Sequence, residues 1–157
     1  MYEQIKEIDR ENIYKIIKVI VLRNSQKNKY FMQNCKMKPI KNSSFEKPEF
    51  ISLVEGRMQG YFAYLYDKIN DKIVNIELIA FEDSPVFVRD FLKFCGYIGD
   101  NFRKIEISVI PGNPAYRIAR KAFDKYNFKR IGTLDESIRL IDGKYYPVEI
   151  WQRRAEQ

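Results

Sequence analysis

The sequence predicts a mixed α/β domain in which an antiparallel meander precedes a parallel strand pair that a helix connects. Three observations support this fold. Apolar residues alternate with a period of two over residues 50–81, they recur with helical spacing on either side, and helices that begin near Pro85 and Pro114 flank a short strand. The 157 residues suffice for one core, and no Pro/Gly/Ser-rich linker divides them, so we expect a single domain over residues 1–157.

The composition excludes several classes of function. The chain has no histidine, and Cys35 and Cys95 lie far apart, which excludes imidazole catalysis and the common zinc sites. A formal charge of +7 favours anionic partners such as phosphorylated cofactors or nucleic acid. Apolar runs are short and charges interrupt the first ten residues, so we expect a cytoplasmic protein without a membrane segment or secretory leader.

The first predicted helix covers residues 10–22, with Asp9 as its N-cap. Its buried face is expected to consist of Ile13, Ile16, Ile17, Ile20 and Val21, which recur with helical spacing. The pattern over residues 24–48 is poor, and we place a short second helix at residues 27–35 without clear periodicity. Residues 23–41 carry six cations and no acid, which fits a solvated surface better than a nucleic-acid patch.

Three strands follow, at residues 50–54, 60–66 and 73–81, with turns at Glu55-Gly56 and residues 68–71. In the third strand Glu77 shares one face with Ile79 and Phe81. The opposite face is also apolar, so this strand should be central in the sheet.

Ser84 is the predicted N-cap of the most clearly marked helix, with Pro85 at its first position. Its apolar stripe consists of Phe87, Phe91, Phe94, Cys95 and Ile98. A strand at residues 104–110 follows. Because a helix joins it to the strand at 73–81, the two should be parallel neighbours.

Asn113-Pro114 predicts the start of another helix by the same logic. Its buried stripe should consist of Ala115, Ile118, Ala119, Ala122, Phe123 and Tyr126. Residues 128–140 and 144–153 predict a closing hairpin around Asp142-Gly143. If the chain forms a homodimer, this hairpin is the segment we expect to pair across a two-fold axis.

Three stretches carry a family likeness: Val54-Glu55-Gly56 before Gly60-Tyr61, the strand Ile76 to Phe81, and Asn113-Pro114 through Phe123 to Asn127-Phe128. With the order of the elements, they resemble the GNAT superfamily of N-acetyltransferases over about residues 50–151. Residues 5–45 faintly resemble the N-terminal helices of spermidine/spermine-type members, through Glu11-Asn12 and Gln33-Asn34.

The resemblance implies that the chain uses acetyl-CoA as co-substrate and needs no metal. It implies acetyl transfer to a primary amine of a small molecule or peptide, by direct attack in a ternary complex. The cofactor would lie where the two parallel strands diverge, with its pyrophosphate at the start of the following helix. The implied cofactor-binding residues are Ala80, Phe81, Ser84, Val86, Arg89, Asn113, Tyr116 and Arg120.

Two residues are the catalytic candidates. Glu77 lies in an apolar strand, where burial would raise its pKa toward that of a useful base; the alternative is a rim carboxylate paired with a lysine from the neighbouring strand. Phe123 stands where the family commonly has the tyrosine that protonates the thiolate. Tyr126 is therefore the candidate acid, with core packing as its alternative and Tyr116 as a nearby substitute.

The chain departs from the family at its phosphate loop. Residues 82–90 contain no glycine, Pro85 removes one amide donor, and Glu82 and Asp83 are negatively charged. This keeps open a GNAT-like binding module without catalysis and, less favoured, a basic nucleic-acid-binding domain. A polyamine acceptor would need local acids to offset the charge of +7. The candidates for such a cluster are Glu46, Glu49, Glu55 and Glu77.

Overall fold

The structure, a computed structural model, describes residues 1–25, 29–30, 44–81 and 83–155. The helices are α1 (Glu7–Ser25), α2 (Pro85–Asn101) and α3 (Tyr116–Lys125). The strands are β1 (Tyr2–Gln4), β2 (Phe45–Glu46), β3 (Glu49–Val54), β4 (Arg57–Asp67), β5 (Lys72–Ala80), β6 (Lys104–Val109), β7 (Lys129–Arg139) and β8 (Tyr145–Arg154).

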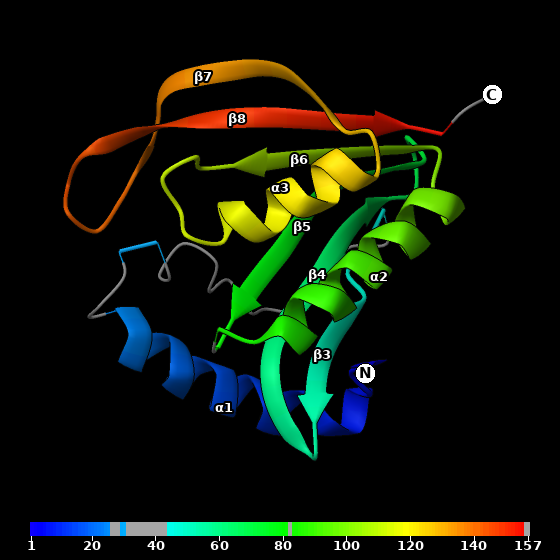
Figure 1. Cartoon of the computed structure of the whole chain (residues 1–157), viewed down its shortest axis with the longest axis vertical. Coiled ribbons are helices and arrows are strands. Elements are labelled where there is room, and N and C mark those ends of the chain that lie inside the picture. Colours follow the sequence, from blue (N-terminus) through cyan, green and yellow to red (C-terminus); the bar gives the residue numbers. More distant parts are fainter. Residues whose placement is uncertain (26–28, 31–43, 82, 156–157) are drawn as a thin grey trace.

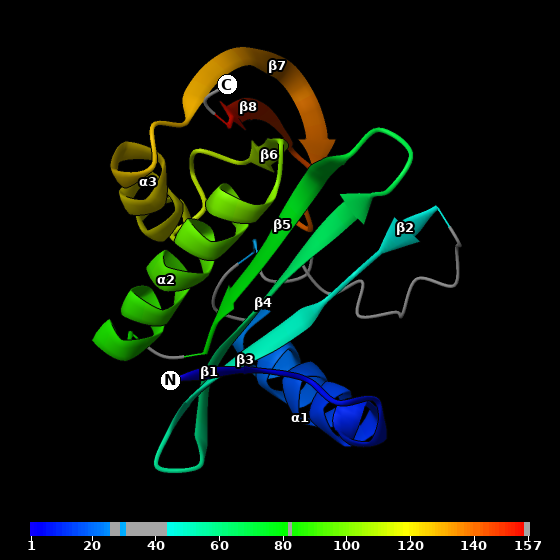
Figure 2. The ribbon, with the colours of Figure 1, turned by 90° about the vertical axis from the view of Figure 1, so that its right-hand side faces the viewer.

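One mixed sheet connects all the strands, in the order β1-β3-β4-β5-β6-β8-β7, with β2 paired to β4. Helix α1 lies on one face of the sheet, and α2 and α3 lie on the other (Figures 1 and 2). A hydrophobic core fills each interface. Among the residues that the structure describes, the helices are all too short or too polar to serve as transmembrane segments.

The predicted meander is confirmed. Strands β3, β4 and β5 pair antiparallel, and β5 lies between β4 and β6, as the apolar character of both its faces predicted. Glu55 and Gly56 form the two-residue turn between β3 and β4, with φ angles of +48° and +76°. The short edge strand β1 and the two-residue β2 were not predicted, since neither is long enough to give a pattern.

Helix α1 is longer than predicted, and two details of the prediction are wrong. The helix begins at Glu7, so Asp9 lies in its acidic first turn and is not the N-cap. Tyr14, Ile17 and Val21 form the buried face, whereas Ile16 is 46% exposed. The helix predicted at residues 27–35 lies almost wholly outside the described residues.

Helix α2 confirms its predicted cap and stripe. Ser84 Oγ accepts a hydrogen bond of 3.3 Å from the Phe87 amide, and every residue of the predicted stripe is buried. Phe94 packs on Phe62 of β4 with ring centroids 4.6 Å apart. The sequence did not predict the buried polar contact across this interface, in which Ser52 of β3 donates to Asp90 at 2.7 Å.

Helix α3 begins at Tyr116, two residues later than Pro114 predicted. Asn113 still organises the turn, because its Oδ1 accepts a hydrogen bond of 3.0 Å from the Ala115 amide. Ala119, Ala122 and Phe123 are buried, and the other three residues of the predicted stripe are partly buried against the same core. The closing hairpin forms as predicted from β7 and β8.

Gly60 allows α2 to approach the sheet closely. A Cβ atom at this position would lie 2.1 Å from Cε2 of the fully buried Phe87. We therefore expect Gly60→Ala to displace Phe87 and the first turn of α2, at a cost of about 1–3 kcal/mol in the free energy of unfolding. Urea denaturation measures this loss. Gly132→Ala is the matched control, because a Cβ there has no neighbour within 4 Å; an equal loss in both variants would contradict the expectation.

Candidate functional site

The site is built on the divergence of two parallel strands. β5 and β6 pair at Ile73 and Ile105, and no further ladder pair follows along either strand, both of which are fully described. β5 remains paired with β4 and β6 with β8 along their whole lengths. The sheet therefore opens between two intact halves, and Figure 1 shows β5 and β6 running apart.

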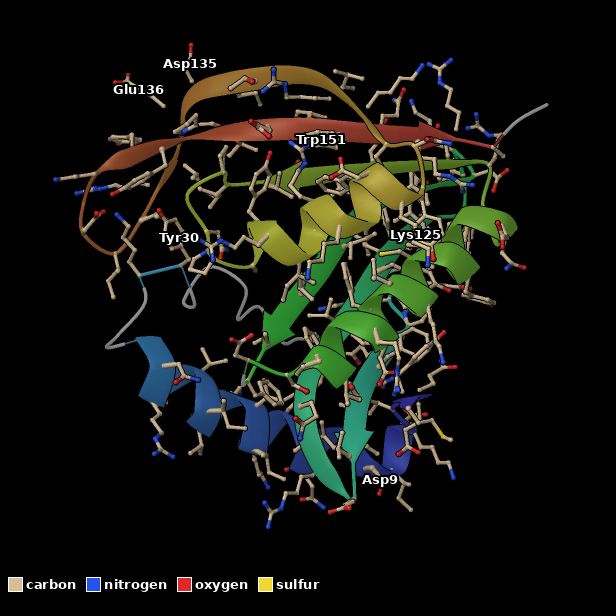
Figure 3. All side chains as sticks on the ribbon, in the orientation of Figure 1. Asp9, Tyr30, Lys125, Asp135, Glu136 and Trp151 are labelled. Atoms are coloured by element: carbon tan, nitrogen blue, oxygen red, sulfur yellow. The ribbon has the colours of Figure 1, made fainter. Side chains whose placement is uncertain are left out.

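A groove of about 1060 Å³ extends from this opening to the start of α2. Its walls are the end of β5, the turn before α3 and the exposed side of α3. Five of the predicted cofactor residues line it, namely Ala80, Phe81, Ser84, Asn113 and Tyr116. Tyr30 closes one side, where its ring packs edge-on against Tyr146 of β8 with centroids 6.2 Å apart (Figure 3).

A second cavity, of about 350 Å³, lies between the diverging strands under α3. Glu77, Leu78, Ile107 and Phe123 are among the residues that line it. Phe123 is 2% exposed and stacks on Trp151, with ring centroids 4.6 Å apart. Tyr116 lines both cavities, so it lies where they adjoin.

Two of the amides at the start of α2 are closed to a ligand. Pro85 has no N–H, and the Phe87 N–H donates a hydrogen bond to the Ser84 hydroxyl. Val86 is half-buried and lines neither cavity. Its backbone N–H is thus the first-turn amide that an anion could meet.

Cations gather instead on the groove between α2 and α3. Arg89, Lys93, Lys121 and Lys125 line it, with Asp83 as the acid among the described lining residues. Figure 3 shows Lys125 at the end of α3 beside α2. Arg120, one of the implied cofactor-binding residues, is not brought to this groove. It lies over the Trp151 ring at 4.9 Å and pairs with Asp124 at 3.2 Å.

Glu149 of β8 holds the Tyr116 hydroxyl. Its carboxylate accepts hydrogen bonds from Tyr116 at 2.8 Å, Trp151 Nε1 at 2.9 Å and Arg130 at 3.2 Å. Burial acts to raise the pKa of Glu149, but these three donors outweigh it and leave that pKa below its ordinary value. An ionised Glu149 thus fixes Tyr116 at the junction of the cavities.

A second buried carboxylate lies on the α1 face. Glu49 is 2% exposed and accepts hydrogen bonds from Arg10 Nε at 3.0 Å, Tyr61 at 2.8 Å and Tyr14. Burial, together with this carboxylate, raises the pKa of the Tyr61 hydroxyl well above its usual range. The cluster ties α1 to β3 and β4.

Glu77 belongs to the same face and is paired with a lysine. Lys47 Nζ lies 2.9 Å from Glu77 Oε2. Burial raises the pKa of Glu77 despite that cation, in the direction expected for a base. The ion pair that the alternative interpretation required exists, but its lysine comes from the segment before β3, not from a strand beside β5.

Tyr126 is not brought to either cavity. It caps α3, and its hydroxyl donates to the Leu92 carbonyl of α2 at 2.8 Å. Sequence reasoning assigned no role to two residues of the site, Lys47 and Glu149. The strand pattern places Glu149 and Trp151 on the same face of β8, which was the available signal for that contact. Nothing local links Lys47 to Glu77.

No protein-family model matches the chain, and no curated protein matches it at a significant level. Solved structures are similar over almost the whole chain. The spermidine N-acetyltransferase of Vibrio cholerae in complex with CoA and spermine gives a TM-score of 0.67 at 14% identity, covering 98% of this chain and 94% of that chain.

Two further structures are similar. The acetyltransferase of Salmonella typhimurium that modifies the N-terminal serine of ribosomal protein L7/L12 gives a TM-score of 0.65 at 15% identity, covering 99% of this chain and 94% of that chain. RimL, a ribosomal L7/L12 α-N-protein acetyltransferase in complex with coenzyme A, gives 0.65 at 12% identity, covering 98% and 93%. Likeness at these identities establishes the fold, and the chain has that of the GNAT acetyltransferases.

Proposed function

We propose that the chain is an N-acetyltransferase that moves an acetyl group from acetyl-CoA to a primary amine by direct attack within a ternary complex. The divergence of β5 and β6 carries the proposal. Beyond Ile73 no ladder pair joins β5 to β6 among the described residues, and a cavity lies between the two strands. The pantetheine arm of CoA contains two amide groups, which suit a place beside a strand because they donate and accept hydrogen bonds as a strand does.

The cations that line the groove between α2 and α3 support a binding place there for the phosphates of the cofactor. Arg89, Lys93, Lys121 and Lys125 face the space between α2 and α3 at the start of α2. Phosphates bound there would meet the N-terminal end of the helix dipole and four cationic side chains. We infer that side chains take over the phosphate contacts that a glycine-rich loop would otherwise make.

Acetyl transfer requires a base for the amine and a proton for the departing thiolate. Glu77, with its raised pKa and its place beside the cavity between the strands, is the proposed base. Tyr116 is the proposed proton donor, because it lines both cavities and Phe123 has no hydroxyl; its proton, which Glu149 accepts in this structure, would pass to the thiolate. A backbone N–H near Ala80 or Phe81 would stabilise the oxyanion.

The acceptor is proposed to carry one primary amine, on a small molecule or a peptide. The similar spermidine acetyltransferase was solved with a polyamine. In this chain the two carboxylates near the opening are already engaged, Glu49 with Arg10 and Glu77 with Lys47. Glu46 pairs with Lys68 at the exposed edge. Glu55, the fourth candidate, lies in the β3–β4 turn, so the four acids do not form the cluster of free carboxylates that a polycation needs.

Acetyl-CoA and CoA should each raise the melting temperature. At a hundredfold excess over Kd, binding adds about 2.7 kcal/mol, which corresponds to about 5–10 °C for a chain of this size. Differential scanning fluorimetry measures the shift. In Lys121→Ala/Lys125→Ala, loss of charged phosphate contacts should raise Kd at least about tenfold. Lys15→Ala, on the far side of α1, is the matched control.

Failure to bind would discriminate between the remaining functions. No shift at millimolar acetyl-CoA would reject the enzyme, and binding without thiol release over a panel of amines would favour a non-catalytic module. A DNA duplex that stabilises the chain in a salt-sensitive manner would favour the nucleic-acid-binding alternative.

Tyr116→Phe and Tyr126→Phe form a matched pair of variants. Loss of a proton donor should lower kcat on the order of a hundredfold in Tyr116→Phe, with little change in the KM for acetyl-CoA. Tyr126→Phe should lose about 1 kcal/mol of stability with its hydrogen bond to Leu92 and retain its kcat. Release of CoA thiol measures both. The opposite pattern would return the acid role to Tyr126.

The lowered pKa of Glu149 gives a pH-dependent contribution to stability. The contribution is present above the ordinary value of 4.5 and is lost as the pH falls through the lower folded-state pKa. Urea denaturation should therefore show the wild type losing its advantage over Glu149→Gln below about pH 4.5. Glu136→Gln, an exposed carboxylate of the same hairpin, controls for net charge (Figure 3). A wild-type advantage that stays constant with pH would contradict the assignment.

A further inference from the structure

Lys47 is unusually enclosed for a paired lysine. Its side chain is 5% exposed, and that of its partner Glu77 is 21% exposed. The other lysine side chains in ion pairs of the described residues range from 19% to 67% exposed. Ion pairs between exposed side chains add little stability and are mobile. The Lys47 amine is enclosed and paired with a carboxylate, so its position is fixed.

That fixed position is beside the opening of the sheet. Glu77 lines the cavity between β5 and β6 and lies four residues beyond Ile73, where the last pairing of the two strands is found. The Glu77 carboxylate is on the α1 face with Lys47, while the cavity extends under α3 on the other face. The larger groove is lined by Ile79 and Phe81, which pack with α1 on the same face as the Glu77 carboxylate, so an acyl group in that groove would approach the carboxylate and its lysine on their own face.

Any amine that uses Glu77 as its base must lie within hydrogen-bonding distance of that carboxylate. In this structure the amine in that position belongs to the chain itself. We propose that Lys47 is an internal acceptor, so that the chain acetylates its own Lys47 Nζ. This proposal rests on the proposed function, because it uses the same acetyl donor and the same base.

The step balances with the groups already named. Glu77 takes one proton from the Lys47 ammonium, and the neutral amine attacks the thioester carbonyl. The N–C bond forms and the C–S bond breaks. Tyr116, the proposed acid, protonates the departing thiolate and regains a proton as nitrogen loses its second one. The products are acetyl-Lys47 and CoA thiol, and the proton on Glu77 passes to solvent.

The experiment incubates the purified full chain with acetyl-CoA and follows modification by intact mass and peptide mapping. Four proteins are compared: the wild type, Lys47→Arg, Glu77→Gln and Lys68→Arg. Lys47→Arg keeps the cation beside Glu77 but removes the acceptor. Lys68 is the matched control, because it also pairs with a glutamate, Glu46 at 3.3 Å, but is 40% exposed.

Self-acetylation predicts one acetyl group on Lys47 of the wild type and of Lys68→Arg, and none at position 47 in Lys47→Arg. Glu77→Gln should slow the modification on the order of a hundredfold. The rate per molecule should not change on tenfold dilution of the protein, because the reaction is intramolecular. Uncatalysed acetylation would instead favour exposed Lys68 over enclosed Lys47 and would be insensitive to Glu77.

Two outcomes overturn the proposal in different ways. If acetyl-CoA raises the melting temperature and CoA thiol is released with an added amine, but Lys47 stays unmodified or reacts independently of Glu77, self-acetylation is rejected while the proposed function stands. If acetyl-CoA neither stabilises the chain nor modifies it, the proposed function is rejected together with self-acetylation.

Discussion

The site depends on the limited pairing between β5 and β6. Two parallel strands joined by a helical connection would normally form a continuous ladder, but here the ladder ends at Ile73 and Ile105. The strands can separate because each has a complete partner on its other side, β4 for β5 and β8 for β6. Phe91 of α2 and Phe123 of α3 border the opening and contribute to its apolar wall.

Periodicity predicted the elements on which this geometry is built. The stripe of α2 and the alternation of the meander are long, strongly apolar patterns, and each formed as expected. Periodicity could not predict where the Tyr126 side chain points, since that residue caps α3 with a φ of −111° and no longer follows the helical spacing. It also could not predict the contact between Lys47 and Glu77, whose positions are thirty residues apart and depend on the complete sheet.

The start of α2, the proposed phosphate end of the site, is shaped by two neighbouring residues, Ser84 and Pro85. Pro85 removes an N–H, and the Ser84 hydroxyl occupies the Phe87 amide while it stabilises the helix start. The same residues that make α2 easy to predict therefore weaken its end as an anion site. Lysines from α2 and α3 come together because α3 packs beside α2, so the proposed cofactor site would depend on the α2–α3 interface. Such side-chain contacts are more sensitive to salt than backbone contacts to a wrapped loop.

The α1 face shows how charge balance limits the acceptor. Four charged groups form two ion pairs there, Arg10 with Glu49 and Lys47 with Glu77. Tyr61 lies near both pairs: burial is the main cause of its raised pKa, and both carboxylates raise it further. Removal of one cation would leave a buried carboxylate without compensation, which is costly in a protein interior. Under the proposed function, an incoming amine would replace Lys47 beside Glu77, as a single cation exchanged for a single cation. A monoamine meets that condition, whereas a polycation would bring further charges to a face on which Glu49 and Glu77 each already have one cation.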